Sequence, residues 1–114
     1  MADPQIRHPF GLADTKTLSA TGAQAITIDD DLTIIDGVST QATGNRTLNL
    51  TINSEVKAGA RILLKSKTNA TETTIFGTGI SSVTITGVAG KTKTQGFTYD
   101  GTNFLPDGTS VQID

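Results

Sequence analysis

Apolar and polar residues alternate most clearly in residues 47–52, TLNLTI, near the middle of the chain. The side chains of a strand point alternately to its two faces, so this period of two predicts a strand with one buried face and one solvated face. A second run of the same kind, ARILLK, occupies residues 60–65 after a short break that ends at Gly59. The centre of the chain is therefore predicted to be a pair of strands.

Similar short runs, separated by turn residues, fill most of the remaining chain. The predicted strands are residues 16–20, 24–28, 31–35, 38–41, 46–52, 60–65, 72–76, 82–86, 92–99, 103–105 and 110–113. Turn signals recur at intervals of about 8 to 12 residues, which is typical of all-β domains. The fold class is predicted to be all-β: a single small antiparallel sandwich, barrel or prism with an extended N-terminal arm.

Three local signals refine this prediction. Asp36-Gly37 predicts a turn that separates two strands. Asp100-Gly101 predicts a hairpin, because Asp-Gly suits the positive backbone angles of a tight turn. Residues 53–59 are predicted to include one helical turn, with Ser54 as its N-cap and Gly59 at its end.

Residues 1–15 differ in kind from the β domain predicted for residues 16–114. Proline fixes its own backbone angle and pushes the preceding residue towards an extended conformation, so Pro4 and Pro9 predict an extended arm. Ile6, Phe10 and Leu12 supply apolar side chains that such an arm could bury on a partner. The alternative is a terminus without a docking role.

Threonine occurs 21 times, whereas Phe, Tyr and Trp together make only five residues. Threonine favours strands and suits a half-wet face, but the usual bulky core residues are scarce. Such a chain is expected to complete its burial against copies of itself or within a larger assembly. The chain has no Cys, which excludes disulfides and thiolate metal sites.

Few residues suggest catalysis or a cofactor. His8 is the only histidine and lies in the predicted arm, so no histidine-dependent catalytic group is indicated. Asp29, Asp30, Asp31 and Asp36 could offer oxygen ligands to a calcium ion, but they lack the spacing of a known calcium loop and acidic turns are common. The prediction is a protein that is not an enzyme and has no cofactor.

Nucleic acid and membranes are not expected partners. The net charge is -2, and the six Lys or Arg residues after residue 54 come without an aromatic platform for bases. No run approaches the roughly 18 apolar residues of a membrane span, and the start MADP lacks the pattern of an export signal. The chain is therefore expected to be soluble, with no export signal of its own.

Residues 44–80 and 87–104 resemble β-rich modules of bacteriophage virions. The matching motifs are the TLNLT strand, the AGARILL return, the FGTGI turn and the terminal YDGTNF hairpin. Modules of this kind occur in fibre proteins and in small capsid decoration or head-fibre proteins, often as homotrimers. The resemblance implies a structural virion protein on the capsid surface that is a homotrimer and binds the major capsid protein or another virion protein.

The shortness of the chain favours a decoration or head-fibre subunit over a tail fibre. The arm would then dock on the shell, with Pro4, Ile6, Pro9, Phe10 and Leu12 as the capsid contact. The alternative is a host-surface glycan-binding or adhesion module of a phage fibre. Glycan sites commonly stack a sugar on an exposed aromatic ring, for which Phe76, Phe97, Tyr99 and Phe104 are the candidates.

Overall fold

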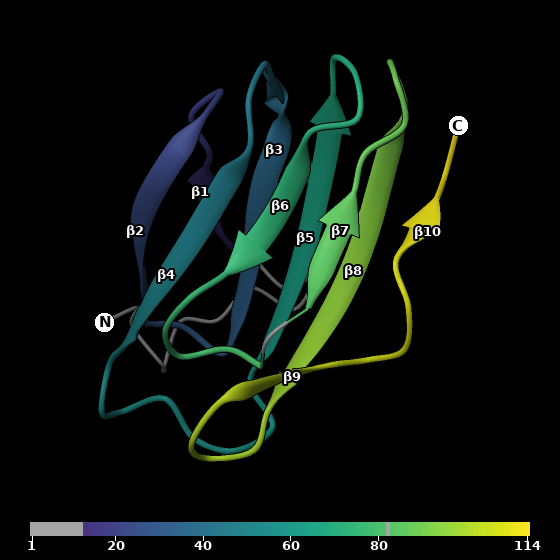
Figure 1. Ribbon diagram of the computed structural model, residues 1–114. Coiled ribbons are helices and arrows are strands. Elements are labelled where there is room, and N and C mark those ends of the chain that lie inside the picture. The colour runs from purple at the N-terminus through teal and green to yellow at the C-terminus, as the bar shows by residue number, and fades with distance from the viewer. Residues whose placement is uncertain (1–12, 82) are drawn as a thin grey trace.

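The computed structural model describes residues 13–81 and 83–114, which form ten strands and no helix. The strands are β1 (Asp14–Thr17), β2 (Gly22–Ile28), β3 (Leu32–Ala42), β4 (Arg46–Ile52), β5 (Arg61–Thr68), β6 (Thr73–Phe76), β7 (Thr84–Thr86), β8 (Thr92–Tyr99), β9 (Phe104–Pro106) and β10 (Val111–Gln112) (Figure 1). The all-β prediction is confirmed. With no helix among these residues, none is long and apolar enough to cross a membrane.

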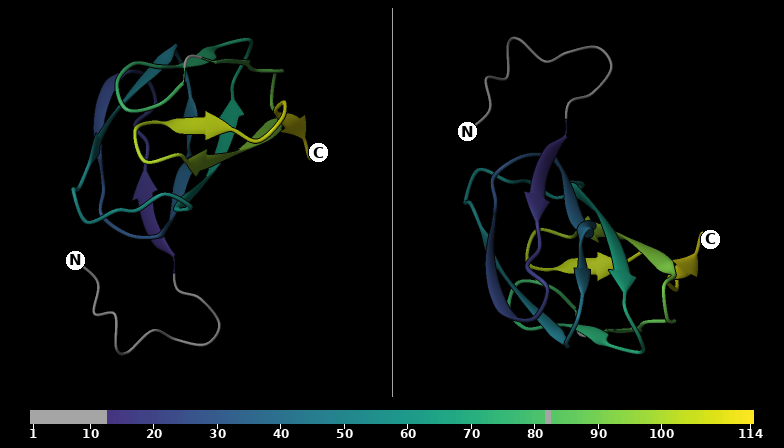
Figure 2. Two further views of the ribbon diagram at one scale, coloured as in Figure 1. Left: turned by 90° about the horizontal axis from the view of Figure 1, so that it is seen from below. Right: turned by 90° about the horizontal axis from the view of Figure 1, so that it is seen from above.

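The strands form two open sheets that face each other as two layers (Figure 2). Sheet A has the order β1-β3-β5-β8-β10, and β9 also pairs with β8. Sheet B has the order β2-β4-β6-β7. Because neither sheet closes on itself, the barrel among the expected architectures is wrong, and the arrangement is a sandwich of two layers.

The expected antiparallel pairing is wrong for the first six strands. From β1 to β6 the chain alternates between the sheets, and each strand lies parallel to the one two places before it. The chain therefore advances as a flattened coil. Only the last four strands reverse direction: β7 is antiparallel to β6, β8 to β5, and β9 and β10 to β8. Alternating side chains report which face a residue occupies but not the direction of the neighbouring strand, which explains the error.

The core lies between the two sheets and has the predicted parity. In β4, Leu48 is fully buried and Leu50 is 4% exposed, whereas Thr47, Asn49 and Thr51 point outwards. The buried apolar residues from both sheets form one cluster: Leu18, Ile26, Ile28, Ile35, Leu48, Leu50, Ala60, Ile62, Leu64, Phe76, Ile80, Ile85, Phe97, Tyr99 and Phe104. Burial of one face of each sheet against the other is the main stabilising term for such a domain.

The turn predicted at Asp36-Gly37 is wrong, because β3 continues through it to Ala42. The register between β3 and β5 shifts after Gly37, which marks an irregularity and not a reversal of the chain. A β-carbon at position 37 would lie 2.7 Å from Nη1 of Arg46 and 2.8 Å from the backbone oxygen of Lys65. The glycine thus allows a close approach inside the sandwich instead of forming a turn.

The helical turn predicted in residues 53–59 is also wrong. Two successive turns occupy this segment: the Val56 N–H donates to the Asn53 carbonyl (3.0 Å), and the Ala60 N–H donates to the Lys57 carbonyl (3.2 Å). The Asn53 side chain, and not Ser54, accepts a bond from a backbone N–H, that of Glu55 at 2.9 Å. Asparagine competes with helical hydrogen bonding in this way, because its side chain bonds the nearby backbone.

The hairpin predicted at Asp100-Gly101 is confirmed. Tyr99 in β8 pairs with Phe104 in β9, so the loop has four residues. Only Gly101 has a positive φ, 101°, and the side chain of Asp100 accepts bonds from the backbone N–H groups two and three residues later, both at 2.8 Å. An Asp side chain that bonds the following backbone is a common way to hold such a loop.

Candidate functional site

The residues expected to contact a capsid, Pro4, Ile6, Pro9, Phe10 and Leu12, lie outside the described residues. The structure does describe the point at which this segment joins the sandwich. Strand β1 begins at Asp14, so the last two residues assigned to the arm belong to sheet A.

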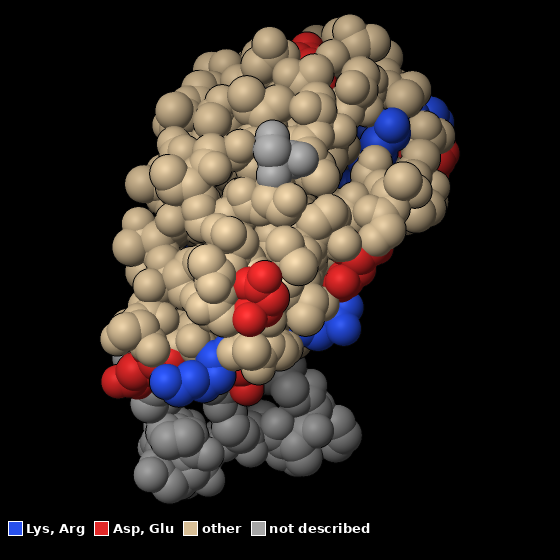
Figure 3. Space-filling model, turned by 60° about the horizontal axis from the view of Figure 1, so that its bottom comes forward, with Lys and Arg blue, Asp and Glu red and all other residues tan. Residues whose placement is uncertain are grey.

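The chain enters the sandwich at the end where the β2–β3 turn lies. Asp14 pairs with Thr33, two residues after that turn, residues 29–31. The segment of residues 53–60 ends there too, because the Arg61 N–H donates to the Asp31 carbonyl at 3.0 Å. We call this end of the molecule the entry end. Acidic and basic side chains gather around it in the lower part of the coloured surface in Figure 3.

An open pocket of about 340 Å³ lies at the entry end. Its wall is made by the β2–β3 turn and by the two turns that precede β5. The lining residues are Asp29, Asp30, Asp31, Glu55, Val56, Lys57, Ala58, Gly59 and Ala60. Four of these residues are acidic and one is basic, so the pocket favours a cationic group over an anionic one.

The fourth residue of the predicted acidic cluster, Asp36, lies elsewhere, in the interior of β3. Its carboxylate accepts bonds from the Ser39 hydroxyl (2.5 Å) and from the backbone N–H groups of Val38 (2.8 Å) and Ser39 (3.1 Å). The Ser39 hydroxyl first, and then the two backbone N–H groups, lower the pKa of Asp36 from 3.8 to about 2. Asp36 is thus bound to its own strand and does not join the residues of the turn.

The metal site considered from the sequence has no support in the geometry. In residues 13–81 and 83–114, no three or more His, Asp or Glu side chains come together to hold a metal ion. The three aspartates of the turn are consecutive in sequence, and consecutive side chains diverge, whereas calcium takes six to eight converging oxygen atoms. The turn is therefore a feature of the pocket wall.

A residue that the sequence analysis did not single out, Arg46, is completely buried between the sheets. Its Nη2 donates to the backbone carbonyls of Gly37 and Lys67, both at 3.0 Å. Its Nε and Nη1 have no partner among the described residues. Burial is the main cause that lowers the pKa of Arg46 from its ordinary value. Arginine stays protonated in proteins, so this side chain is a positive charge that ties β4 in sheet B to β3 and β5 in sheet A.

The sequence did contain a signal for Arg46. The residue has the same parity as Leu48 and Leu50, and this parity faces the core. A charged residue on the apolar parity of a strand is unusual, because a buried charge costs free energy unless it has partners. Gly37 makes room for Arg46 because it has no side chain. In the sequence it follows an aspartate, and this pair predicts a turn, so the local signal pointed away from the core.

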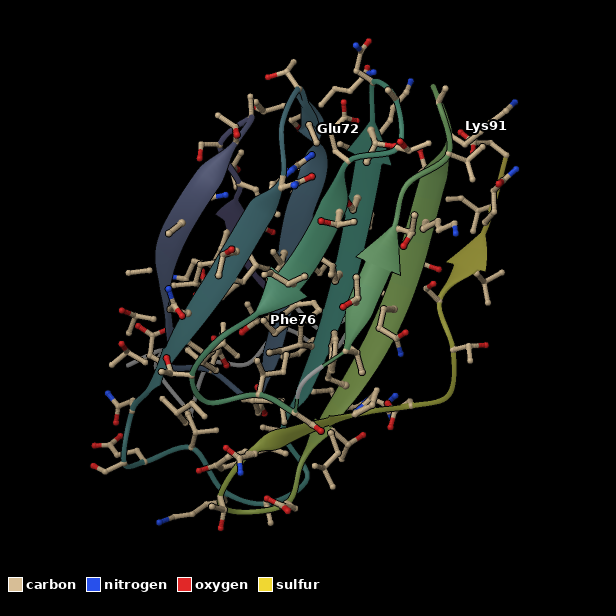
Figure 4. All side chains as sticks on the ribbon, in the orientation of Figure 1. Glu72, Phe76 and Lys91 are labelled. Carbon is tan, nitrogen blue, oxygen red and sulfur yellow. The ribbon has the colours of Figure 1, made fainter. Side chains whose placement is uncertain are left out.

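The four aromatic residues considered for glycan stacking are all in the core. Phe76 and Phe97 contact each other edge to face with ring centroids 5.3 Å apart, and Phe76 points into the space between the sheets (Figure 4). Tyr99 and Phe104 are stacked with centroids 4.9 Å apart. All four are less than a tenth exposed, so none of them presents a ring to a sugar.

The outer faces of the two sheets differ in charge. Sheet A carries five charged residues on or beside its outward positions: Asp36, Arg61, Lys65, Lys67 and Asp107. Arg61 and Asp107 form an exposed ion pair at 2.9 Å. The outward positions of sheet B contain only Thr, Ala, Asn and Ile. The outer face of sheet A is therefore charged, as is usual for a surface in water, whereas the outer face of sheet B is not.

No protein-family model, curated protein or solved structure matches this chain. The functional interpretation therefore depends on the residues and on their arrangement.

Proposed function

We propose that the chain is a structural virion protein, a capsid decoration or head-fibre subunit that docks on a phage shell through its N-terminal arm. The sequence resemblance supports the class of protein. The arm would place Ile6 and Phe10 against the major capsid protein or another virion protein, and the β domain would stand on the capsid surface. A homotrimer is the assembly that the resemblance implies.

The observation that carries the proposal is the position of the chain's entry into the sandwich. Strand β1, which follows the proposed arm in the sequence, begins at the entry end, where the acidic pocket and the charged turns also lie. Glu72 and Lys91 lie at the opposite end (Figure 4). A subunit attached by an arm at one end can hold a compact domain away from the surface to which it is attached. The paired strands between the two ends give that domain a fixed shape, since backbone hydrogen bonds and a single core hold it together.

The alternative, a glycan-binding or adhesion module, lacks a supporting observation among the described residues. Its candidate aromatic rings are needed in the core. Binding of the purified protein to a carbohydrate array would support that alternative.

The test is co-sedimentation of the full-length protein with empty shells of the phage that encodes it. The variants are Ile6→Asp and Phe10→Asp, and the matched control is Val111→Asp. Val111 lies on β10, near the C-terminus of the chain and far from the arm in sequence, and is 57% exposed. We expect the wild type and the control to sediment with the shells and both arm variants to stay in the supernatant.

A charge placed on an apolar contact is left buried and unpaired, which costs several kcal/mol and lowers affinity by orders of magnitude. The proposal fails if the wild type does not bind shells. The assignment of the contact to the arm fails if both arm variants bind as the wild type does.

A further inference from the structure

The outer face of sheet B has ten outward positions without a charged residue. These positions are Ala23, Ala25, Thr27, Thr47, Asn49, Thr51, Thr73, Ile75, Thr84 and Thr86. We call them the neutral face. Strands β2, β4, β6 and β7 present it towards the viewer in Figure 1, and it is seen obliquely in the upper part of Figure 3, where the atoms are tan.

This lack of charge is unusual for a surface in contact with water. The chain contains 20 charged residues, nine basic and eleven acidic. Protein surfaces are roughly 25–35% charged, so about three of ten outward positions are expected to carry a charge. The outer face of sheet A meets this expectation, whereas the neutral face does not. The difference is a property of one face of the sandwich.

The register makes the neutral face continuous. Ala23 in β2 lies beside Thr47 in β4, Thr47 beside Ile75 in β6, and Ile75 beside Thr84 in β7. Ile75 is 40% exposed at the middle of this row. The side chains on either side of it are small, so another flat surface could approach the backbone closely and cover Ile75.

The chemistry of the neutral face fits a second copy of the same face. A threonine hydroxyl both donates and accepts hydrogen bonds, so two threonine-rich faces can satisfy each other. Identical faces that carry charge would bring like charges together, which costs free energy, and this face avoids that cost. The face has no aromatic ring for a sugar or a base and no cation for a phosphate, so its residues do not suit those ligands.

We propose that the neutral face is the surface through which copies of this chain associate. The inference rests on the proposed function for the number of copies, three, and goes beyond it by assigning the contact to the outer face of sheet B. In the assembly the copies turn their neutral faces towards a common axis and bury Ile75. The charged face of sheet A stays in water.

The test is native mass spectrometry of the full chain and of matched variants. Thr47→Glu places a carboxylate at the middle of the neutral face. Thr94→Glu makes the same change on the outer face of sheet A, where the neighbouring residue across the strands is Lys65. Both threonines are half-buried outward residues of interior strands, so the two changes place similar demands on folding. A second variant, Thr86→Glu on the exposed edge strand β7, serves if Thr47→Glu does not fold.

We expect the wild type and Thr94→Glu at three times the 11.8 kDa chain mass, and Thr47→Glu and Thr86→Glu at the monomer mass with unchanged circular dichroism. A monomeric wild type, or neutral-face variants that keep the oligomeric mass of the wild type, would overturn the inference. Co-sedimentation with shells separates this result from the proposed function. If the wild type binds shells but is a monomer, only the inference fails. If it is a trimer that Thr47→Glu dissociates but binds no shells, only the proposed function fails.

Discussion

Replacing Gly37 by alanine tests how closely β3, β5 and Arg46 pack together inside the sandwich. Gly37 lies in β3 with an ordinary backbone conformation, so an added methyl group causes no backbone strain of its own. The methyl carbon would lie 2.7 Å from Nη1 of Arg46, 2.8 Å from the backbone oxygen of Lys65 and 3.1 Å from Cδ1 of Leu18. Carbon and these atoms normally stay at least about 3.4 Å apart, so several groups must move.

The contact with Lys65 decides the magnitude. A side chain can rotate away from a new methyl group, but the Lys65 oxygen is part of β5 and moves only if the two strands separate. Overpacking in a core typically costs about 1–3 kcal/mol. Alanine in place of glycine in a strand returns about 0.5–1 kcal/mol through the entropy of the unfolded chain. The net of these two terms predicts that Gly37→Ala lowers the free energy of unfolding by about 1.5 kcal/mol.

Gly96→Ala is the matched control. Gly96 lies in the interior of β8, also without a positive φ, but on the outer face of sheet A. Its added methyl group would lie 3.3 Å from Oδ2 of Asp107, the end of an exposed side chain that can move. We expect this variant to be as stable as the wild type or about 0.5 kcal/mol more stable.

The assay is urea denaturation followed by far-ultraviolet circular dichroism, with all proteins at one concentration because association contributes to apparent stability. For a urea dependence of about 1.5 kcal/mol per molar, the midpoint of Gly37→Ala should fall by about 1 M. A midpoint equal to or above that of Gly96→Ala would refute the close packing of β3, β5 and Arg46. The double variant with Arg46→Met should recover only part of the loss, because the contact with Lys65 remains.

Three further changes have expected outcomes. Because the pKa of Asp36 in the folded chain, about 2, lies below its ordinary value of 3.8, its contribution is complete above about pH 5 and is lost as the pH falls towards 2. Asp36→Ala should therefore lower the free energy of unfolding by about 1 kcal/mol at pH 7, allowing for solvent screening, and by less at pH 2.5, as urea denaturation at both values would measure. Arg61→Gln removes the ion pair with Asp107, whose side chains are 59% and 37% exposed, so the urea midpoint at pH 7 should change by less than the equivalent of about 0.5 kcal/mol. Asp100→Ala removes the acceptor that holds the β8–β9 loop, so hydrogen exchange of the N–H groups of residues 102 and 103 should accelerate, while exchange in β4 should not. Equal stability losses for Asp36→Ala at the two pH values, a large midpoint shift for Arg61→Gln, or unchanged exchange for Asp100→Ala would contradict the respective assignments.

The strands themselves were predictable because burial and alternation are local properties. The core parity of Leu48 and Leu50 and the hairpin after Tyr99 both followed from residue type and spacing. The direction and order of the strands did not follow. A turn signal reports that the chain leaves a strand, and the chain can then return beside that strand or cross to the other sheet. Both routes bury the same parity, so the pattern does not distinguish them.

The coil of parallel strands is also not visible in the sequence as an internal repeat. Thr33 pairs with Asp14 of β1 on one side and with Ile62 of β5 on the other. The chain segment from Asp14 to Thr33 is shorter than the segment from Thr33 to Ile62, so successive turns of the coil differ in length. A repeat is visible in a sequence when the period is fixed. Here the longer second turn contains the segment of residues 53–60 that forms the pocket wall. Residues 53–60, which form part of the entry end, therefore make the second turn of the coil longer than the first, and the sequence has no fixed period.

Arg46 and Gly37 show why the site could not be completed from the sequence. Each residue has an ordinary local explanation, a charge near the start of a strand and a turn glycine, and only the pairing of the sheets brings them together. Once paired, each depends on the other: the guanidinium needs the carbonyl of Gly37, and position 37 has no room for a side chain while Arg46 is present. The neutral face is also invisible residue by residue, because a single outward threonine is unremarkable on a strand. It becomes informative when the pairing of β2, β4, β6 and β7 aligns ten uncharged outward positions, six of them threonine, on one side of the molecule. The only charged residue of sheet B among the described residues, Arg46, points into the core. A property of a surface can be read only after the strands that make it have been placed side by side.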